Sequence, residues 1–272
     1  MHLKKIKKLL AISLATTMII LSNTYSIKAM ENEDYSSKTN YSESTNSEEN
    51  DITGLTDEEF DTLYNQFLEH YKNVNFNSDD ENIDAFIEYA IAVGAIENTP
   101  QARDALSVLT YRKEMRTVVA GGRAAGYTTS AELLEHSLQD KPSNKTYKAG
   151  SRVSNQIKNS SEYKKELNKI RNTLKSVSGT SKTINGSMAL TSTTDLHLAF
   201  HAVSYTANCK KVSGKWNITV TVKDRYDFAY QKWGSYGKGL SNAAKVALNN
   251  YGYNAQKVGA IKNYNVSITI NS

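Results

Sequence analysis

The hydrophobic pattern of this chain changes its period near Gly179. Before this point apolar residues recur at helical spacing, as Phe60 and Leu63 illustrate. After it they alternate with polar residues, as Ile218 and Val220 illustrate. This order predicts an α+β fold, in which a helical N-terminal part precedes a mostly antiparallel sheet with one C-terminal helix.

Helix-start signals divide the expected helical domain, residues 54–142, into four helices. The signals are Thr56 with Glu59 as a capping box, Ser78, Thr99-Pro100, and Thr129 or Ser130. The third helix runs toward Gly121-Gly122, which mark a helix stop or a tight helix contact. Pro142 is expected to end the fourth helix, and a polar loop follows it to about Ser151.

The α+β domain is expected over residues 152–272. It begins with a long helix near residues 161–177. Residues 195–209 alternate as a strand does, and Gly214 marks a hairpin between Cys209 and Trp216. A short helix is expected at 241–251 and a final strand at 266–270.

The first 29 residues have the layout of a secretory signal peptide. Lys4, Lys5, Lys7 and Lys8 precede an apolar run at residues 9–21. This run is shorter than the roughly 20 residues that span a bilayer, so we expect cleavage after Ala29 and a secreted, extracellular protein without a transmembrane anchor. The alternative is an uncleaved N-terminal anchor. Residues 30–53 are acidic and polar, and we expect them to form a disordered tether.

The chain has a single cysteine, Cys209, so an internal disulfide is excluded. Burial is the expected state of this thiol, with a reactive group or an intermolecular link as alternatives. An exported chain with so little cysteine suits a Gram-positive source.

Charge is polarised along the sequence. Residues 30–100 hold 18 acidic side chains and two lysines, whereas residues 101–272 hold 26 basic and 10 acidic side chains. The basic part is expected to attract anions, so we predict binding to an anionic or glycan surface such as the cell wall or envelope. Nucleic acid is not an expected partner of an exported protein. In the alternative interpretation the charge is a solvated face, or the acidic part covers it.

The segment Asp224-Arg225-Tyr226-Asp227 is the strongest candidate for chemistry. It follows a predicted strand, and two carboxylates at this spacing can be aimed into one cleft. There they act as an acid and a base, or they hold a hard cation such as Mg²⁺. In the structural alternative the aspartates cap the turn, Arg225 pairs with one of them, and Tyr226 and Phe228 pack.

This Asp-x-Tyr-Asp segment resembles the acidic motif of colicin M-like bacteriocins. Those proteins cleave lipid II, a lipid-linked pyrophosphate, outside the membrane with a divalent cation. The resemblance covers about five residues and the position in a C-terminal domain. It implies that Asp224 and Asp227 are catalytic or metal-linked and that Tyr226 positions the substrate. The family follows its motif with a His-Arg pair, where this chain has Gln231-Lys232-Trp233.

Two further groups of residues carry weaker signals. His197 and His201 lie near Asp195 in the expected strand 195–209, where they suit a zinc site or a proton relay, or simply the solvent face of the strand. The C-terminal part is also dense in Tyr and Asn between residues 249 and 264. Such side chains suit carbohydrate contact when exposed and packing when buried.

Overall fold

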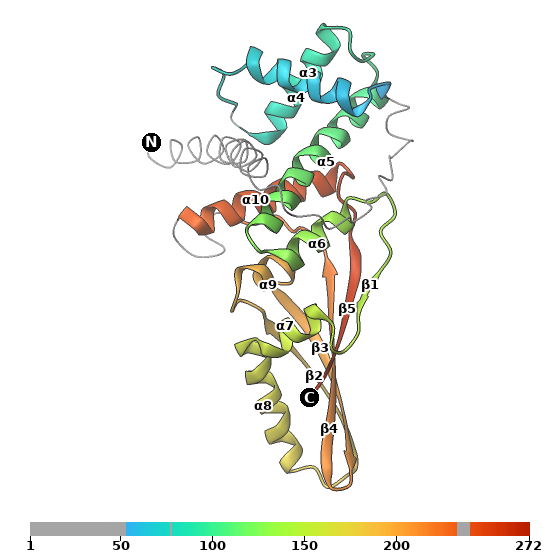
Figure 1. The fold of residues 1–272 in the computed structure, drawn as a ribbon, viewed down its shortest axis with the longest axis vertical. Coiled ribbons are helices and arrows are strands. Elements are labelled where there is room, and N and C mark those ends of the chain that lie inside the picture. Colours follow the sequence, from blue (N-terminus) through green and yellow to red (C-terminus); the bar gives the residue numbers. More distant parts are fainter. Residues whose placement is uncertain (1–52, 77, 233–239) are drawn as a thin grey trace, which may run out of the picture. The chain divides into compact units, whose positions relative to one another are not determined.

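The computed structural model describes residues 53–76, 78–232 and 240–272. Within these ranges it contains eight helices and one five-stranded, mostly antiparallel sheet, which confirms the α+β class (Figure 1). The expected signal peptide and nearly all of the expected tether, residues 1–52, lie outside the described residues.

The chain divides into two compact units that are interleaved along the sequence. The first comprises residues up to Gly121 together with Phe228–Ile261, and the second comprises Gly122–Asp227 together with Lys262–Ser272. The sequence predicted two domains that follow one another along the chain, with the division at residues 142–152. In the structure the chain leaves the second unit once and returns to it for the last strand.

The first unit is helical. Its elements are α3 (Asp57–His70), α4 (Asp79–Ala92), most of α5 (Pro100–Ala124) and α10 (Leu240–Lys257). The capping box at Thr56, the Ser78 cap and the start of α5 at Pro100 confirm three predicted helix starts. A helix stop at Gly121-Gly122 is wrong, because α5 passes through both residues. The chain turns only at Gly126, whose φ of 82° suits glycine.

A buried carboxyl joins three helices of the first unit. Glu114 of α5 accepts hydrogen bonds from the hydroxyls of Tyr64 on α3 and Tyr251 on α10. Burial raises the pKa of Glu114, while the two tyrosine hydroxyls oppose that shift. The tyrosine at 251 thus belongs to the packed interior, where it is 8% exposed.

Amide side chains of α10 hold the segment that precedes residue 232. The Gln256 amide accepts from the backbone N–H of Phe228 at 3.0 Å and donates to its carbonyl at 3.4 Å. The Asn250 amide makes the same pair of contacts with Gln231, at 2.8 and 2.9 Å. Two amides of the Tyr- and Asn-rich stretch are therefore used inside the protein, rather than for the carbohydrate contact considered above.

The second unit is built on the sheet, whose strand order is β1-β5-β4-β3-β2. The strands are β1 (Lys145–Tyr147), β2 (Ser181–Ala189), β3 (Ala202–Val212), β4 (Lys215–Tyr226) and β5 (Tyr264–Asn271). Among these five described strands, only the β1–β5 pair is parallel. The expected hairpin is confirmed, since Ser213-Gly214 joins β3 to β4 with φ values of 48° and 78°, as a tight hairpin turn requires.

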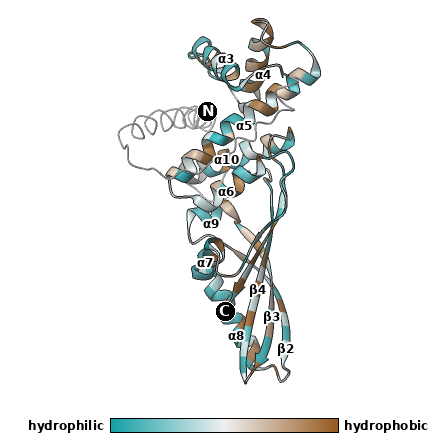
Figure 2. Cartoon of the chain, turned by 45° about the vertical axis from the view of Figure 1, so that its right-hand side comes forward, coloured by the Kyte–Doolittle hydropathy of each residue, from teal (hydrophilic) through white to brown (hydrophobic). Residues whose placement is uncertain are grey.

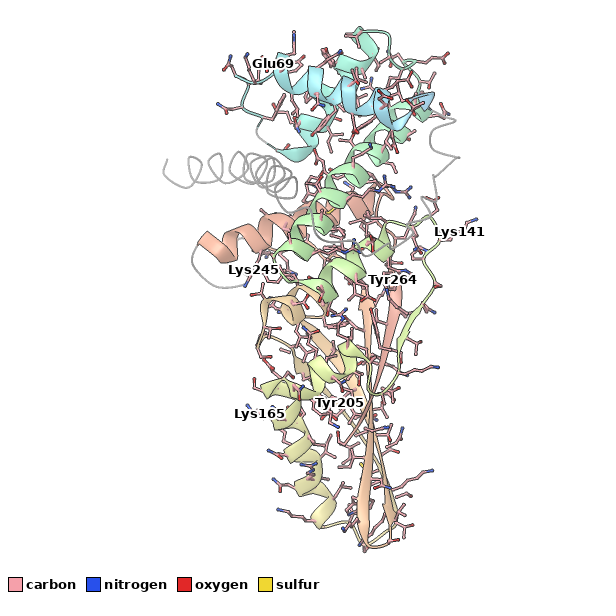
Figure 3. All side chains as sticks on the ribbon, viewed as in Figure 1. Glu69, Lys141, Lys165, Tyr205, Lys245 and Tyr264 are labelled. Carbon is pink, nitrogen blue, oxygen red and sulfur yellow. The ribbon has the colours of Figure 1, made fainter. Side chains whose placement is uncertain are left out.

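Helices cover one face of this sheet. They are α6 (Thr128–Ser137), α7 (Arg152–Asn159), α8 (Ser161–Lys175) and α9 (Thr194–Ala199). In this unit α7 packs against β5 and α8 against β2. The Tyr205 hydroxyl on the covered face donates to Glu166 of α8 at 3.1 Å (Figure 3). Hydropathy alternates along the strands (Figure 2). In β4, for example, Ile218 and Val220 are buried, whereas Asn217 and Thr219, which alternate with them, are more exposed.

Cys209 lies on the covered face of β3 and is 1% exposed, as predicted. Burial raises the pKa of its thiol. The environment is therefore that of a packed, unreactive side chain rather than of a nucleophile.

Three predictions for this unit differ from the structure. Residues 194–199 form the helix α9 instead of the start of a strand, because the Thr193 hydroxyl caps that helix by accepting from the Leu196 N–H at 3.2 Å. Neither Thr129 nor Ser130 caps α6, which begins at Thr128 without a side-chain cap from Tyr127. The loop expected up to residue 151 also contains the short strand β1.

Candidate functional site

Asp224, Arg225 and Tyr226 are the last three residues of β4, and Asp227 follows the strand. Strand alternation places Asp224 and Tyr226 on the same side as buried Val222, and it places Arg225 on the opposite side. Tyr226 is 6% exposed, and its ring stacks on Tyr264 of β5 with centroids 5.3 Å apart. Tyr226 is therefore a packed residue of the sheet.

The two carboxylates contact different groups of the same residue, Arg225. The Asp224 carboxylate accepts from the N–H of Arg225 at 2.9 Å. Asp227 lies beyond the strand, and its Oδ2 is 3.8 Å from Nε of Arg225. The structural alternative expected the pairing of Arg225 with one aspartate, and the contact with Asp227 agrees with it. Within the described ranges, three His, Cys, Asp or Glu side chains do not come together anywhere in a group that fits a metal ion.

Asp224 nevertheless has an unusual ionisation. Burial raises its pKa to about 7, and the charge of Asp227 adds to the rise, while the hydrogen bond from Arg225 opposes it. The carboxyl thus keeps its proton until close to neutral pH. A group of this kind is suited to exchange a proton in a reaction.

Replacement of Asp224 by asparagine is expected to stabilise the protein at pH 8 but not at pH 4. The native carboxyl binds its proton up to about pH 7, whereas the unfolded one releases it near the ordinary aspartate pKa of 3.8, so wild-type stability falls as pH rises between these values. Thermal unfolding should show a gain on the order of 3 °C at pH 8. An equal change in Tm at both pH values would contradict the assigned ionisation.

The two histidines come together, but the Asp195 carboxylate is engaged elsewhere. The rings of His197 and His201 lie 4.9 Å apart, but His197 belongs to α9 and not to a strand. The Asp195 carboxylate accepts from the backbone N–H groups of Thr129 and Ser130, at 3.1 and 2.8 Å. Asp195 therefore caps α6 from a distant part of the chain. The prediction that Asp195 and His197 lie on the same face of a strand is wrong, because both belong to α9.

The solvent-facing side of the sheet, here called the open face, carries rows of hydroxyl and amide side chains. The strand registers align two central rows, each crossing four strands. One row consists of Asn185, Thr206, Thr221 and Thr269, and the other of Thr183, Asn208, Thr219 and Asn271. The Thr206 hydroxyl donates to Asn185 at 2.9 Å, and the Thr183 hydroxyl donates to Asn208 at 3.3 Å.

The charge on the open face has one sign. Its ionisable side chains on β2 to β5 are Lys210, Lys215, Lys223 and Arg225, all exposed, and none is acidic. Acidic residues elsewhere in this unit are engaged. Glu132, for example, accepts from Lys145 at 2.8 Å and from Arg152 at 2.7 Å. The open face is therefore a positively charged, hydroxyl-rich surface.

The sequence-based candidates did not include this face, although its signal is present in the sequence. Between the apolar positions of β4 stand Asn217, Thr219, Thr221, Lys223 and Arg225. The alternation predicts that these side chains share one side of a strand. Which neighbouring strands extend the pattern depends on strand order, and sequence alone did not provide that order.

Comparisons of the chain with protein-family models, with curated proteins and with solved structures found no match. Among the described residues, none of the helices is both long enough and apolar enough to cross a membrane.

Proposed function

We propose that the protein is secreted and that its second unit binds an anionic polymer of the cell wall or envelope through the open face. The observation that supports this function most strongly is the absence of acidic side chains from β2 to β5 on that face, which carries four exposed cations. A surface of one charge sign attracts a polyanion and orients it on approach. The proposed export rests on the signal-peptide pattern in residues 1–29.

The side chains of the open face favour an anionic, hydroxylated polymer over a neutral glycan. Neutral sugars are commonly held by stacking on aromatic rings, and the open face of β2 to β5 has no aromatic residue. Its largest apolar residue is Val212, at the hairpin end. Rows of Thr and Asn instead supply both donors and acceptors for hydroxyl groups.

The direct test is sedimentation of the mature protein with purified bacterial cell walls. We expect the protein to sediment at low salt and to be released as salt rises, because exposed charge contacts are screened over about 10 Å at 0.1 M ionic strength. Failure to sediment at low salt would reject the proposed function.

A second function is supported by the ionisation of Asp224. In this proposal the protein hydrolyses a lipid-linked pyrophosphate such as lipid II, Asp224 exchanges a proton at the reacting phosphate, and nearby Lys223 and Arg225 attract the substrate. A divalent cation is the cofactor that the bacteriocin resemblance implies. Because Asp224 and Asp227 lack a third ligand within the described residues, we derive no step through the metal.

Incubation with purified lipid II and Mg²⁺ tests the hydrolase proposal. Release of a pyrophosphoryl product by the wild-type protein, and its loss in Asp224→Asn and Asp227→Ala, would support it. If the wild-type protein releases no product while it sediments with walls, the binding function alone is retained.

A further inference from the structure

A hollow of about 350 Å³ lies at one end of the open face. It is lined by Ala202 and Ser204 of β3, by Lys223, Asp224 and Arg225 of β4, and by Asn265 of β5. The hollow lies where β3 begins and β4 ends, so it is bounded by three adjacent strands.

The strand register surrounds two cations with neutral hydrogen-bonding groups. Lys223 lies opposite Ser204, and Arg225 lies opposite Asn265. Neighbouring strands are about 4.8 Å apart, and side chains two residues apart on one face are separated by about 6.8 Å. The long side chains of Lys223 and Arg225 can therefore reach one small anion together, with the Asn265 amide beside it. The Ser204 hydroxyl donates to the Lys223 carbonyl at 3.2 Å.

We propose that this hollow binds a phosphodiester group of the wall polymer. The inference rests on the proposed wall-binding function and names the chemical group that the open face recognises. The Arg225 guanidinium presents a fork of N–H donors to two phosphate oxygens, and Lys223 supplies a point charge. A phosphate offers oxygens in several directions, so it suits donors arriving from β4 and β5 better than a planar carboxylate does.

The acidic groups beside the hollow do not prevent this assignment. Asp227 contacts Arg225 at 3.8 Å, close to the outer limit of an ion pair, and the Arg225 side chain is 62% exposed. Exposed pairs of this kind are worth little, so a phosphate oxygen can replace Asp227 at small cost. The Asp224 carboxylate accepts from the backbone N–H of Arg225, so this hydrogen bond does not involve the guanidinium.

The same face provides a matched control. Lys210 and Lys215 are also exposed but lie toward the β3–β4 hairpin. Lys215 is eight residues from Lys223 on the same strand, which corresponds to about 27 Å. The double variants K223Q/R225Q and K210Q/K215Q therefore remove equal charge from opposite ends of one surface.

Sedimentation with two wall preparations tests the phosphate assignment. One preparation is native, and the other is stripped of phosphodiester polymers but keeps its carboxylates. Wild-type binding should be about tenfold weaker on stripped walls. K223Q/R225Q should bind native walls about tenfold more weakly than the wild type and should not weaken further on stripped walls. K210Q/K215Q should retain the dependence on phosphate. Thermal unfolding of all variants verifies that they fold.

Competition distinguishes a phosphate site from general screening. Inorganic phosphate should displace the wild-type protein from native walls more effectively than chloride at equal ionic strength, and poly(glycerol phosphate) should be more effective still per phosphate. Equal wild-type binding to native and stripped walls would overturn this inference while leaving the wall-binding function intact. Tighter binding of free phosphate than of the polymer would also overturn it. Absence of wild-type binding to either preparation would reject the wall-binding function itself.

Discussion

Replacement of Asp195 by alanine is expected to lower the free energy of unfolding by about 3 kcal/mol. The carboxylate is 6% exposed and accepts from two backbone N–H groups at the start of α6. It also accepts from the Gln156 amide of α7 at 2.9 Å. Its removal leaves these donors buried without their acceptor and takes a negative charge away from a helix N-terminus.

The effect should depend on pH with a defined sign. Burial tends to raise the pKa of Asp195, but the hydrogen bonds from Gln156, Ser130 and Thr129 outweigh it and hold the pKa below the usual value. The stabilisation is therefore complete above about pH 4 and is lost as pH falls through the lower native pKa. Wild type and variant should converge in stability in acid.

Urea unfolding at pH 7 and near pH 3 provides the measurement. Asp140→Ala is the matched control, because it removes an exposed carboxylate from the loop after α6. We expect that control to change the unfolding free energy by less than about 0.5 kcal/mol. If Asp195→Ala lowers the unfolding free energy at pH 7 by no more than the Asp140→Ala control does, the Asp195 carboxylate does not cap α6.

Neutralisation of the four cations of the open face is expected to weaken wall binding about 30-fold at low salt. The variant carries Lys210→Gln, Lys215→Gln, Lys223→Gln and Arg225→Gln. An exposed ion pair is worth roughly 0.2–1 kcal/mol, so four contacts supply about 2 kcal/mol, and 1.4 kcal/mol corresponds to a tenfold change in affinity. The salt dependence of the remaining binding should also become shallower.

A second fourfold variant separates the open face from net charge. Lys164, Lys165, Arg171 and Lys175 are exposed on α8, which packs on the other side of the sheet (Figure 3). Their replacement by glutamine removes the same charge from the same unit. We expect this variant to lose no more than about threefold in affinity, because its open face is intact. Equal losses in both variants would assign wall binding to overall charge and not to the open face.

Local signals in the sequence predicted many of the elements. The capping box at Thr56 and the hairpin turn at Gly214 act over a few residues, and the structure confirms both. Local signals also explain why the strand predicted from residue 195 is wrong at its start, where residues 194–199 form α9. Its alternating residues also place Leu196 and Ala199 three positions apart, and both are buried in α9. The Thr193 cap decides in favour of the helix.

The candidate site was less accessible to sequence reasoning, because its contacts join distant residues. Asp195 reaches α6 across 65 residues, a partnership that spacing does not reveal. The sequence indicated that the Asp224–Asp227 segment lies close to the end of a strand, although it placed the segment after the strand, whereas its first three residues belong to β4. However, whether its carboxylates share a cleft depends on the face of the strand that each one occupies and on the neighbouring strands.

The amino-acid sequence alone determined the α+β class, the burial of Cys209 and the segregation of polar and apolar side chains along each strand. These properties follow from local periodicity and from the cost of leaving apolar groups in water. Only the tertiary structure decided that β5 lies beside β4, and that hydroxyl, amide and cationic side chains of four strands form one surface. Strand order and register depend on contacts between distant parts of the chain, which local periodicity does not specify.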